Sequence, residues 1–147
     1  MSDQTLQAVI QLCSTLGPVA YFTSPNLLAI LNTAQLKIVV KEGLVNFAPY
    51  LFASLGYVYC GIQEDADTGY RYGNLALKLL EDGKEDRIKA RTLFSYNFFV
   101  RHWKEPIKNT IAPLLEGYEA GLRLGDFEHA AYVGSWPLGI AFCQEHP

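Results

Sequence analysis

The spacing of apolar residues, which recur every three to four positions along most of the chain, is the feature that most constrains the fold. Four such stripes are Leu27, Leu31, Ala34 and Ile38; Tyr72, Leu75, Ala76, Leu79 and Leu80; Ala90, Leu93, Phe94 and Phe98; and Ile107, Ile111, Leu114, Leu115, Tyr118 and Leu122. This spacing places each stripe on one face of an α-helix. No segment alternates apolar and polar residues around an Asn-Gly or Asp-Gly turn, so strands are not expected. The spacing predicts an all-α protein.

Residues that start and stop helices divide these stripes into separate segments. The expected N-caps are Ser24 (followed by Pro25), Asn46, Asp65 or Asp67, and Asp126. The expected stops are Gly43, Gly83 and Gly125, because glycine takes the left-handed conformation that ends many helices. The predicted helices cover residues 4–15, 25–42, 47–61, 67–82, 86–103, 106–124 and 127–142. Pro113 and Pro137 fall inside two of them and are expected to kink or shorten those helices.

The three stop glycines are spaced almost regularly, by 40 residues (Gly43 to Gly83) and 42 residues (Gly83 to Gly125). A similar segment of small and aromatic residues follows each stop and begins at Ala48, Ala90 and Ala130. Two helices in each period of about forty residues are typical of helical repeat arrays. The pattern predicts one domain, residues 1–147, built as an α-solenoid of about three stacked hairpins that resemble tetratricopeptide (TPR) units. Without an obviously polar last helix, the chain is expected to be a fragment of a longer array, and its ends are expected to allow self-association.

The composition limits which binding partners and which cellular compartment are expected. The 12 basic and 15 acidic side chains leave a net charge of −3, which predicts binding to neither nucleic acid nor an anionic membrane surface. The most apolar window is too short to span a bilayer and the first residues do not resemble a signal peptide. Three scattered cysteines, Cys13, Cys60 and Cys143, are typical of reduced thiols used in packing. We therefore expect a cytoplasmic protein.

Several strings resemble one known family. They are Tyr59-Cys-Gly, the run from Asp67 to Leu80, Phe98-Phe-Val-Arg-His-Trp-Lys, Pro113-Leu-Leu-Glu-Gly-Tyr-Glu-Ala-Gly-Leu and Leu124-Gly-Asp-Phe-Glu-His-Ala-Ala-Tyr. They are similar to the helical, TPR-like repeat region that follows the AAA-type ATPase module in large cyanobacterial signalling proteins. Those proteins carry a Ser/Thr kinase domain, the ATPase with its repeats, a GAF domain and a histidine kinase. The resemblance covers about residues 16–142 and implies a regulatory or scaffolding segment.

Motifs that would indicate catalysis or a bound cofactor are missing from the sequence. No phosphate-binding loop, kinase catalytic loop or GxSxG serine motif occurs, so no catalytic residue and no cofactor are expected. The acidic run that starts at Asp65 has neither the glycine nor the glutamate of a calcium loop, and helix capping is the preferred interpretation. His102, His129 and His146 lack metal-ligand spacing, so no metal site is expected. We interpret His102 as a histidine at a helix end.

One charged region allows two interpretations. Seven of the twelve basic residues lie between Lys84 and Lys108, next to a group of acidic residues, and Glu85 and Lys89 are four apart. The preferred interpretation is a solvated helix face with weak ion pairs. The alternative is a docking surface for a partner, built from Arg101, His102, Trp103 and Lys104, because tryptophan and arginine are common interface anchors.

Two functional hypotheses follow from these observations. The first is a non-catalytic protein-interaction or regulatory module whose partner is a protein, such as another signalling domain. The second is a small helical sensor that binds a ligand in an aromatic-lined groove, since the chain contains 8 Phe, 9 Tyr and 2 Trp. An enzyme is the least supported class, because the sequence offers no nucleophile with a base and no metal ligands.

Overall fold

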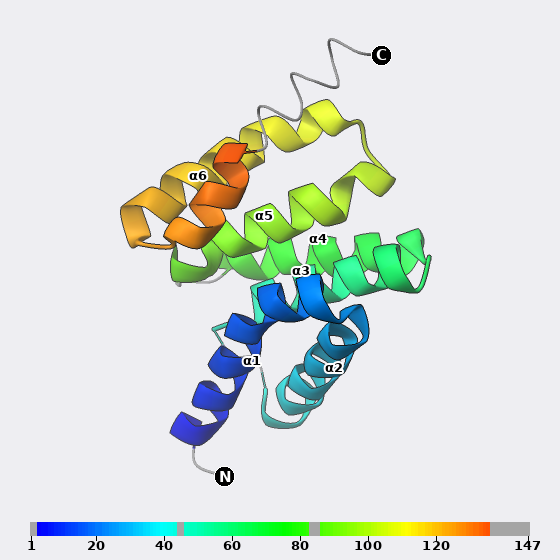
Figure 1. Ribbon diagram of the computed structural model, residues 1–147, viewed down its shortest axis with the longest axis vertical. Coiled ribbons are helices and arrows are strands. Elements are labelled where there is room, and N and C mark those ends of the chain that lie inside the picture. Colours follow the sequence, from blue (N-terminus) through cyan, green and yellow to red (C-terminus); the bar gives the residue numbers. More distant parts are fainter. Residues whose placement is uncertain (1–2, 44–45, 83–85, 136–147) are drawn as a thin grey trace.

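The computed structural model describes residues 3–43, 46–82 and 86–135, and these residues are helical throughout apart from short connections (Figure 1). The α-helices are α1 (Asp3–Thr23), α2 (Pro25–Glu42), α3 (Ala48–Tyr57), α4 (Ala66–Asp82), α5 (Lys89–Phe99), α6 (Ile111–Leu124) and a last helix over residues 127–135. A π-helical turn (Val58–Ile62) extends α3, and 3-10 turns cover Asp86–Ile88, Arg101–Trp103 and Ile107–Thr110. No strand occurs in the described residues, which confirms the all-α prediction.

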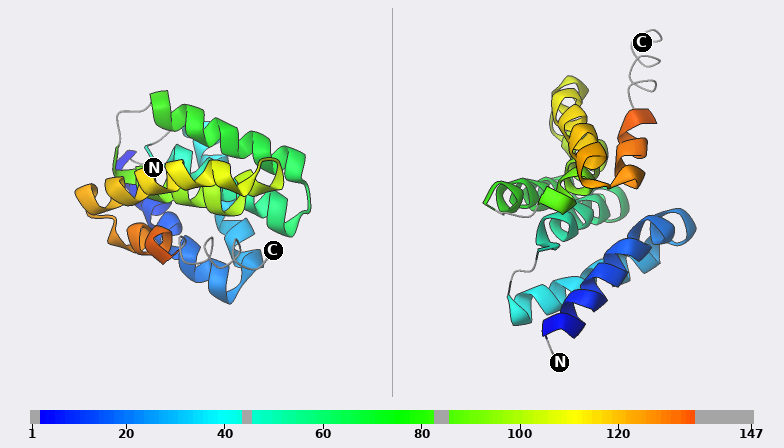
Figure 2. Two further views of the ribbon diagram at one scale, coloured as in Figure 1. Left: turned by 90° about the horizontal axis from the view of Figure 1, so that it is seen from above. Right: turned by 90° about the vertical axis from the view of Figure 1, so that its left-hand side faces the viewer.

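Helices that follow one another in the chain pack as pairs. The pairs are α1 with α2, α3 with α4 and α5 with α6, and α3 also packs along α5. Figure 2 shows the first pair on one side of α3 and the helix over residues 127–135 beside α6. The main core lies between α2, α3, α4 and α5 and includes Val39, Leu51, Ala53, Tyr96 and Val100. The three similar segments that begin at Ala48, Ala90 and Ala130 bury equivalent positions. The buried pairs are Ala48 and Leu51, Ala90 and Leu93, and Ala130 and Val133.

The pair α3–α4 is held close by glycines that have no room for a side chain. A Cβ atom on Gly69 would lie 2.7 Å from the carbonyl oxygen of Gly56 and would also meet the sulfur of Cys60. A Cβ atom on Gly73 would meet the ring of Tyr96. Burial raises the pKa of the Cys60 thiol to about 11, as expected for a cysteine that serves packing.

The boundary of the first helix differs from the prediction. The helix was expected to end at residue 15, but α1 continues through Gly17 and Pro18 to Thr23. Proline removes one hydrogen bond from a helix interior. Continuous burial on one side of α1, at Ile10, Ser14 and Ala20, supports the helix across this interruption. The predicted end at residue 15 was wrong, because this burial outweighs the local tendency of Gly17-Pro18 to interrupt a helix.

The segments around α5 and α6 are shorter than predicted. Residues 86–103 form α5 only between Lys89 and Phe99, with a 3-10 turn at each end, and α6 begins at Ile111 instead of residue 106. Pro113 is therefore the third residue of α6, where its missing N–H needs no partner. The expectation that Pro113 shortens its helix is confirmed. Pro137, Gly83 and the end of the predicted 127–142 helix lie outside the described residues.

Most of the predicted caps are in place. Asp65 caps α4, because its Oδ1 accepts a hydrogen bond from the backbone N–H of Thr68 at 3.0 Å. Gly43 and Gly125 end their helices with φ of 96° and 81°. Ser24 occupies the N-cap position of α2. The prediction for Asn46 was wrong, because the N-cap of α3 is Phe47 and makes no side-chain cap bond.

Candidate functional site

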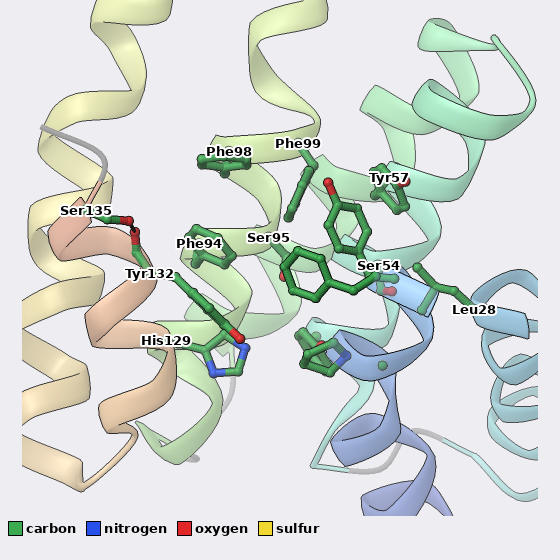
Figure 3. Close-up of a pocket in the computed structure, with 15 residues that line it drawn as sticks. Leu28, Ser54, Tyr57, Phe94, Ser95, Phe98, Phe99, His129, Tyr132 and Ser135 are labelled. Atoms are coloured by element: carbon green, nitrogen blue, oxygen red, sulfur yellow. Dashed lines mark hydrogen bonds between the residues drawn. The ribbon is translucent and has the colours of Figure 1, made fainter. Parts of the chain in front are cut away.

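An aromatic pocket of about 230 Å³ lies between helices of the described residues. Its walls come from α1, α3, α5 and the helix over residues 127–135, and Figure 3 shows side chains from these helices pointing into one space. A second hollow beside it shares Tyr21, Tyr57, Phe98 and Phe99 with the first. We call the two hollows together the aromatic groove. Its rings are Tyr21, Phe22, Tyr50, Tyr57, Phe94, Phe98, Phe99, Trp103 and Tyr132 with the imidazoles of His102 and His129.

One wall of the groove is a cluster of three rings that joins α1 to α3 and α5. The centroid of Tyr21 lies 5.3 Å from that of Tyr57 and 5.2 Å from that of Phe99. The rings of Tyr57 and Phe99 lie 5.0 Å apart. Such tilted and edge-on contacts stabilise aromatic pairs beyond their buried area. These rings therefore link α1 to α3 and α5, while α1 packs mainly against α2.

The opposite wall holds a buried polar network behind the rings. His129 is only 4% exposed, and its Nδ1 lies 2.9 Å from Oδ1 of Asp126. The Nε of Arg91 donates a hydrogen bond of 3.0 Å to the other oxygen, Oδ2, of Asp126. The ring of His129 meets those of Tyr50, Phe94 and Tyr132 nearly edge-on. The network thus fixes a histidine among three aromatic rings of the groove.

Burial and nearby charges determine which side chains of this wall carry a proton at neutral pH. Burial alone would raise the pKa of Asp126. Its interactions with His129 (a hydrogen bond and the charge of the imidazole) and with Arg91 outweigh burial, and they lower the pKa to about 2. Burial raises the pKa of Tyr50 to about 12, although Arg91 opposes this shift from 5.8 Å above the ring. At neutral pH Asp126 is therefore a carboxylate that accepts the Nδ1 proton of His129, and Tyr50 keeps its hydroxyl proton.

The four residues predicted as a docking surface lie together, but only two of them line the groove. His102 and Trp103 do so, and Trp103 is half-exposed with its Nε1 donating to the carbonyl of Phe99. Arg101 instead binds Glu105 and Asn97, and the Nζ of Lys104 lies 2.6 Å from Asp67. His102 follows the end of α5, as predicted for a histidine at a helix end.

Glu105 joins α4 to the 3-10 turns Arg101–Trp103 and Ile107–Thr110, and its carboxylate predicts how stability depends on pH. Hydrogen bonds from Arg101, Tyr70 and Asn109 lower its pKa from 4.5 to about 2. Between these pH values the unfolded chain binds a proton that the folded chain does not. We therefore expect this contribution to be present above about pH 5 and to be lost as the pH falls towards 2. Urea denaturation of the wild type and of Glu105→Gln across this range should give a shallower decline for the variant. Parallel profiles would contradict the assignment.

Sequence reasoning offered an aromatic-lined groove and the Asp126 cap, but it did not say which rings form the groove and it missed the role of His129. Phe94 was expected on a core-facing stripe; Phe94 and Tyr50 are both buried, yet the same rings also line the pocket. Asp126 does stand before the last helix, with its carbonyl accepting from Ala130, but its carboxylate binds side chains. The spacing of Asp126 and His129, three apart at a helix start, was the available signal.

Other expectations about sites have simple outcomes. Lys89 pairs with Glu116 at 2.6 Å, whereas its predicted partner Glu85 lies outside the described residues, as does His146. Within the described ranges, no three His, Cys, Asp or Glu side chains lie close enough together to hold a metal ion. None of the helices in the same ranges is long and apolar enough to cross a membrane.

No family model matches the chain, and neither the curated proteins nor the solved structures give a match.

Proposed function

We propose that the chain is a non-catalytic protein-interaction module, an α-solenoid of TPR-like hairpins whose aromatic groove receives a segment of a partner protein. The main observation behind this proposal is that four helices contribute rings to one open groove. They are α1, α3, α5 and the helix over residues 127–135. The first helix of each hairpin thus faces the same side, as in helical repeat arrays that bind partners on their concave surface. The buried Ala and Leu or Val positions that recur at Ala48, Ala90 and Ala130 support the repeat.

The chemistry of the groove favours an apolar or aromatic anchor on the partner. Rings dominate its lining, and large rigid side chains are the usual anchors of protein interfaces. The hydroxyl of Ser54 accepts a hydrogen bond from Asn32, and that of Ser135 donates to the carbonyl of Tyr132. These two hydroxyls are therefore engaged in structure, which supports binding rather than nucleophilic attack. In line with the family resemblance, we propose that the partner is a domain of a signalling protein.

A small-molecule sensor is the second candidate, and the volume of the aromatic groove supports it. The first hollow has about 230 Å³, below the roughly 300–1,000 Å³ typical of ligand pockets, and the second has about 370 Å³, within that range, so a compact organic molecule would fit. The same volume also fits one large side chain of a peptide. The second hollow extends the groove towards Trp103 and Ile107, so a ligand longer than one side chain can continue there. This extension favours a peptide over a small molecule.

Substitution of Phe22 tests the groove with little effect on folding. Phe22 lines the pocket yet is 73% exposed, so Phe22→Ala removes a groove contact without opening the core. Twelve-residue peptides selected by phage display on the wild type should bind Phe22→Ala about tenfold more weakly, a loss of about 1.4 kcal/mol. Phe127→Ala is the matched control, because Phe127 is 65% exposed and is absent from the groove lining. Its binding should be unchanged.

Two outcomes would contradict the proposal. The first is a selection that enriches no peptide while an aromatic fragment library gives saturable heats by calorimetry, a result that supports the sensor. The second is equal weakening by Phe22→Ala and Phe127→Ala, which would place the peptide site elsewhere.

A further inference from the structure

The outer face of α1 carries a second, separate surface. Leu12, Leu16 and Val19 are 61%, 43% and 58% exposed, and Val9 precedes them half-buried. At 100° per residue these side chains lie beside the buried face formed by Ile10, Ser14 and Ala20, and the middles of the two faces are about 130° apart. We call Val9, Leu12, Leu16 and Val19 the α1 seam. It does not belong to the aromatic groove, whose α1 residues are Gly17, Pro18, Tyr21 and Phe22.

The spacing of the α1 seam is that of a helix that pairs with another helix. Its members follow one another at intervals of three, four and three residues, the a and d pattern of a coiled coil. Apolar residues with this period form a narrow line that a second helix of the same pattern can cover. A membrane-surface helix differs, because it has a wider apolar face and basic residues beside it. The seam therefore fits a helix better than a lipid surface.

Charge is absent from most of the hairpin around the seam. No Asp, Glu, Lys, Arg or His occurs between Asp3 and Lys37, which covers almost all of α1 and most of α2. Charged residues are depleted at the centres of protein interfaces, because an unpaired charge is costly to bury. Two copies of this surface would meet without like-charge repulsion. The chain can thus serve as its own partner here.

Two threonine hydroxyls beside the α1 seam form their hydrogen bonds within the helix and do not depend on water for an acceptor. Thr15 donates its hydroxyl proton to the carbonyl of Gln11 at 2.9 Å, and Thr23 donates to that of Val19 at 2.7 Å. Both hydroxyls are therefore satisfied within α1. Covering these exposed threonines with another helix would leave no hydroxyl donor without an acceptor, so the desolvation cost of association is small.

We propose that the α1 seam pairs with the α1 seam of a second copy of this chain to form a symmetric dimer. A two-fold axis lets one surface cover itself and closes the assembly at two copies. Three exposed side chains make a contact smaller than the roughly 800 Å² per partner of a standard interface, so the dimer is reversible and depends on concentration.

Sedimentation velocity of the full chain, from low micromolar to submillimolar concentration, tests the dimer. The wild type should shift from monomer to dimer over this range, and Leu16→Glu should weaken association by about tenfold or more, because it buries a carboxylate in the seam. Leu122→Glu on α6 is the matched control, since Leu122 is similarly exposed, and it should associate like the wild type. An equimolar mixture of Leu16→Glu and Leu16→Lys should recover the dimer. Circular dichroism of each variant checks folding.

If either Leu16 variant unfolds, Val19→Glu and Val19→Lys replace the pair at a more exposed position. A wild type that stays monomeric throughout would overturn the proposal, as would a mixture of opposite charges that fails to associate. Equal loss in Leu122→Glu would overturn it too, because the contact would then involve α6. A monomer that sediments with phosphatidylcholine–phosphatidylglycerol vesicles and loses this binding in Leu16→Glu would assign the seam to a membrane surface instead. The result is independent of the groove, since peptide binding needs no second copy.

Discussion

Replacing Gly69 with alanine is expected to lower the free energy of unfolding by about 3 kcal/mol, the upper part of the range for overpacked cores. The new methyl group would lie 2.7 Å from the carbonyl oxygen of Gly56 and against the sulfur and backbone nitrogen of Cys60. Two of these three obstacles are backbone atoms, which cannot rotate away, so α4 would have to move from α3. Chemical denaturation followed by circular dichroism at 222 nm measures the loss.

Gly134→Ala is the matched control for this effect. Among the described residues, a Cβ atom at Gly134 would meet only the ring of Tyr118, at an ordinary distance of 3.5 Å. Since alanine is the better helix former, this variant should be as stable as the wild type or up to about 1 kcal/mol more stable. If Gly69→Ala were as stable as Gly134→Ala, the close approach of α3 and α4 would be wrong.

Replacing Asp126 with asparagine is expected to lower the free energy of unfolding by about 3 kcal/mol, near the low end for breaking a buried ion pair. The carboxylate is nearly buried, and it accepts hydrogen bonds from both Arg91 and His129. The amide would leave the partly buried Arg91 without its counter-charge and would weaken the orientation of the imidazole. We expect peptides that bind the aromatic groove to bind this variant more weakly as well. Urea denaturation and the peptide titration above provide the two measurements.

Asp67→Asn is the control, because it also removes one carboxylate from an ion pair. Asp67 bonds Lys104, but its side chain is almost fully exposed, so the loss should stay below about 1 kcal/mol. A larger loss in Asp67→Asn than in Asp126→Asn would contradict the structural role of the buried network.

Much of the secondary structure could be predicted from local signals. Ser24-Pro25, Asp65 and Gly125 mark helix boundaries that the structure contains, because capping depends on side chains within a few residues. The predicted end of the first helix at residue 15 failed for the same reason: local chemistry at Gly17-Pro18 favours a break, whereas burial of Ile10 and Ala20 on one face of α1, which packs against α2, supports a continuous helix. The 3-10 turns beside α5 were also missed, since their hydrogen bonds compete closely with those of an α-helix.

The candidate site was predicted only in part. Trp103 and His102 were identified as neighbours on a docking surface, and they lie at one end of the aromatic groove. Arg101 and Lys104 were part of the same prediction, but the structure pairs them with Glu105 and Asp67. Arg101 and Glu105 are four residues apart, a spacing visible in the sequence, whereas the pair between Lys104 and Asp67 joins distant segments and leaves no periodic signal. The partner of Lys104 is therefore unknown until the helices are placed in space.

The sequence by itself determined the all-α class and the approximate position of each helix, because apolar period and capping act over a few residues. It did not determine the buried face of α2, where Leu28 and Val39 are buried together with Asn32 and Gln35, while the predicted Leu27 and Ala34 are exposed. Only the tertiary structure decided that Tyr21, Tyr57 and Phe99 meet, that His129 lies beside Tyr50 and that Gly69 meets Gly56. The physical reason is that helix packing depends on the shapes of two surfaces together, whereas the pattern in each stripe describes one surface at a time.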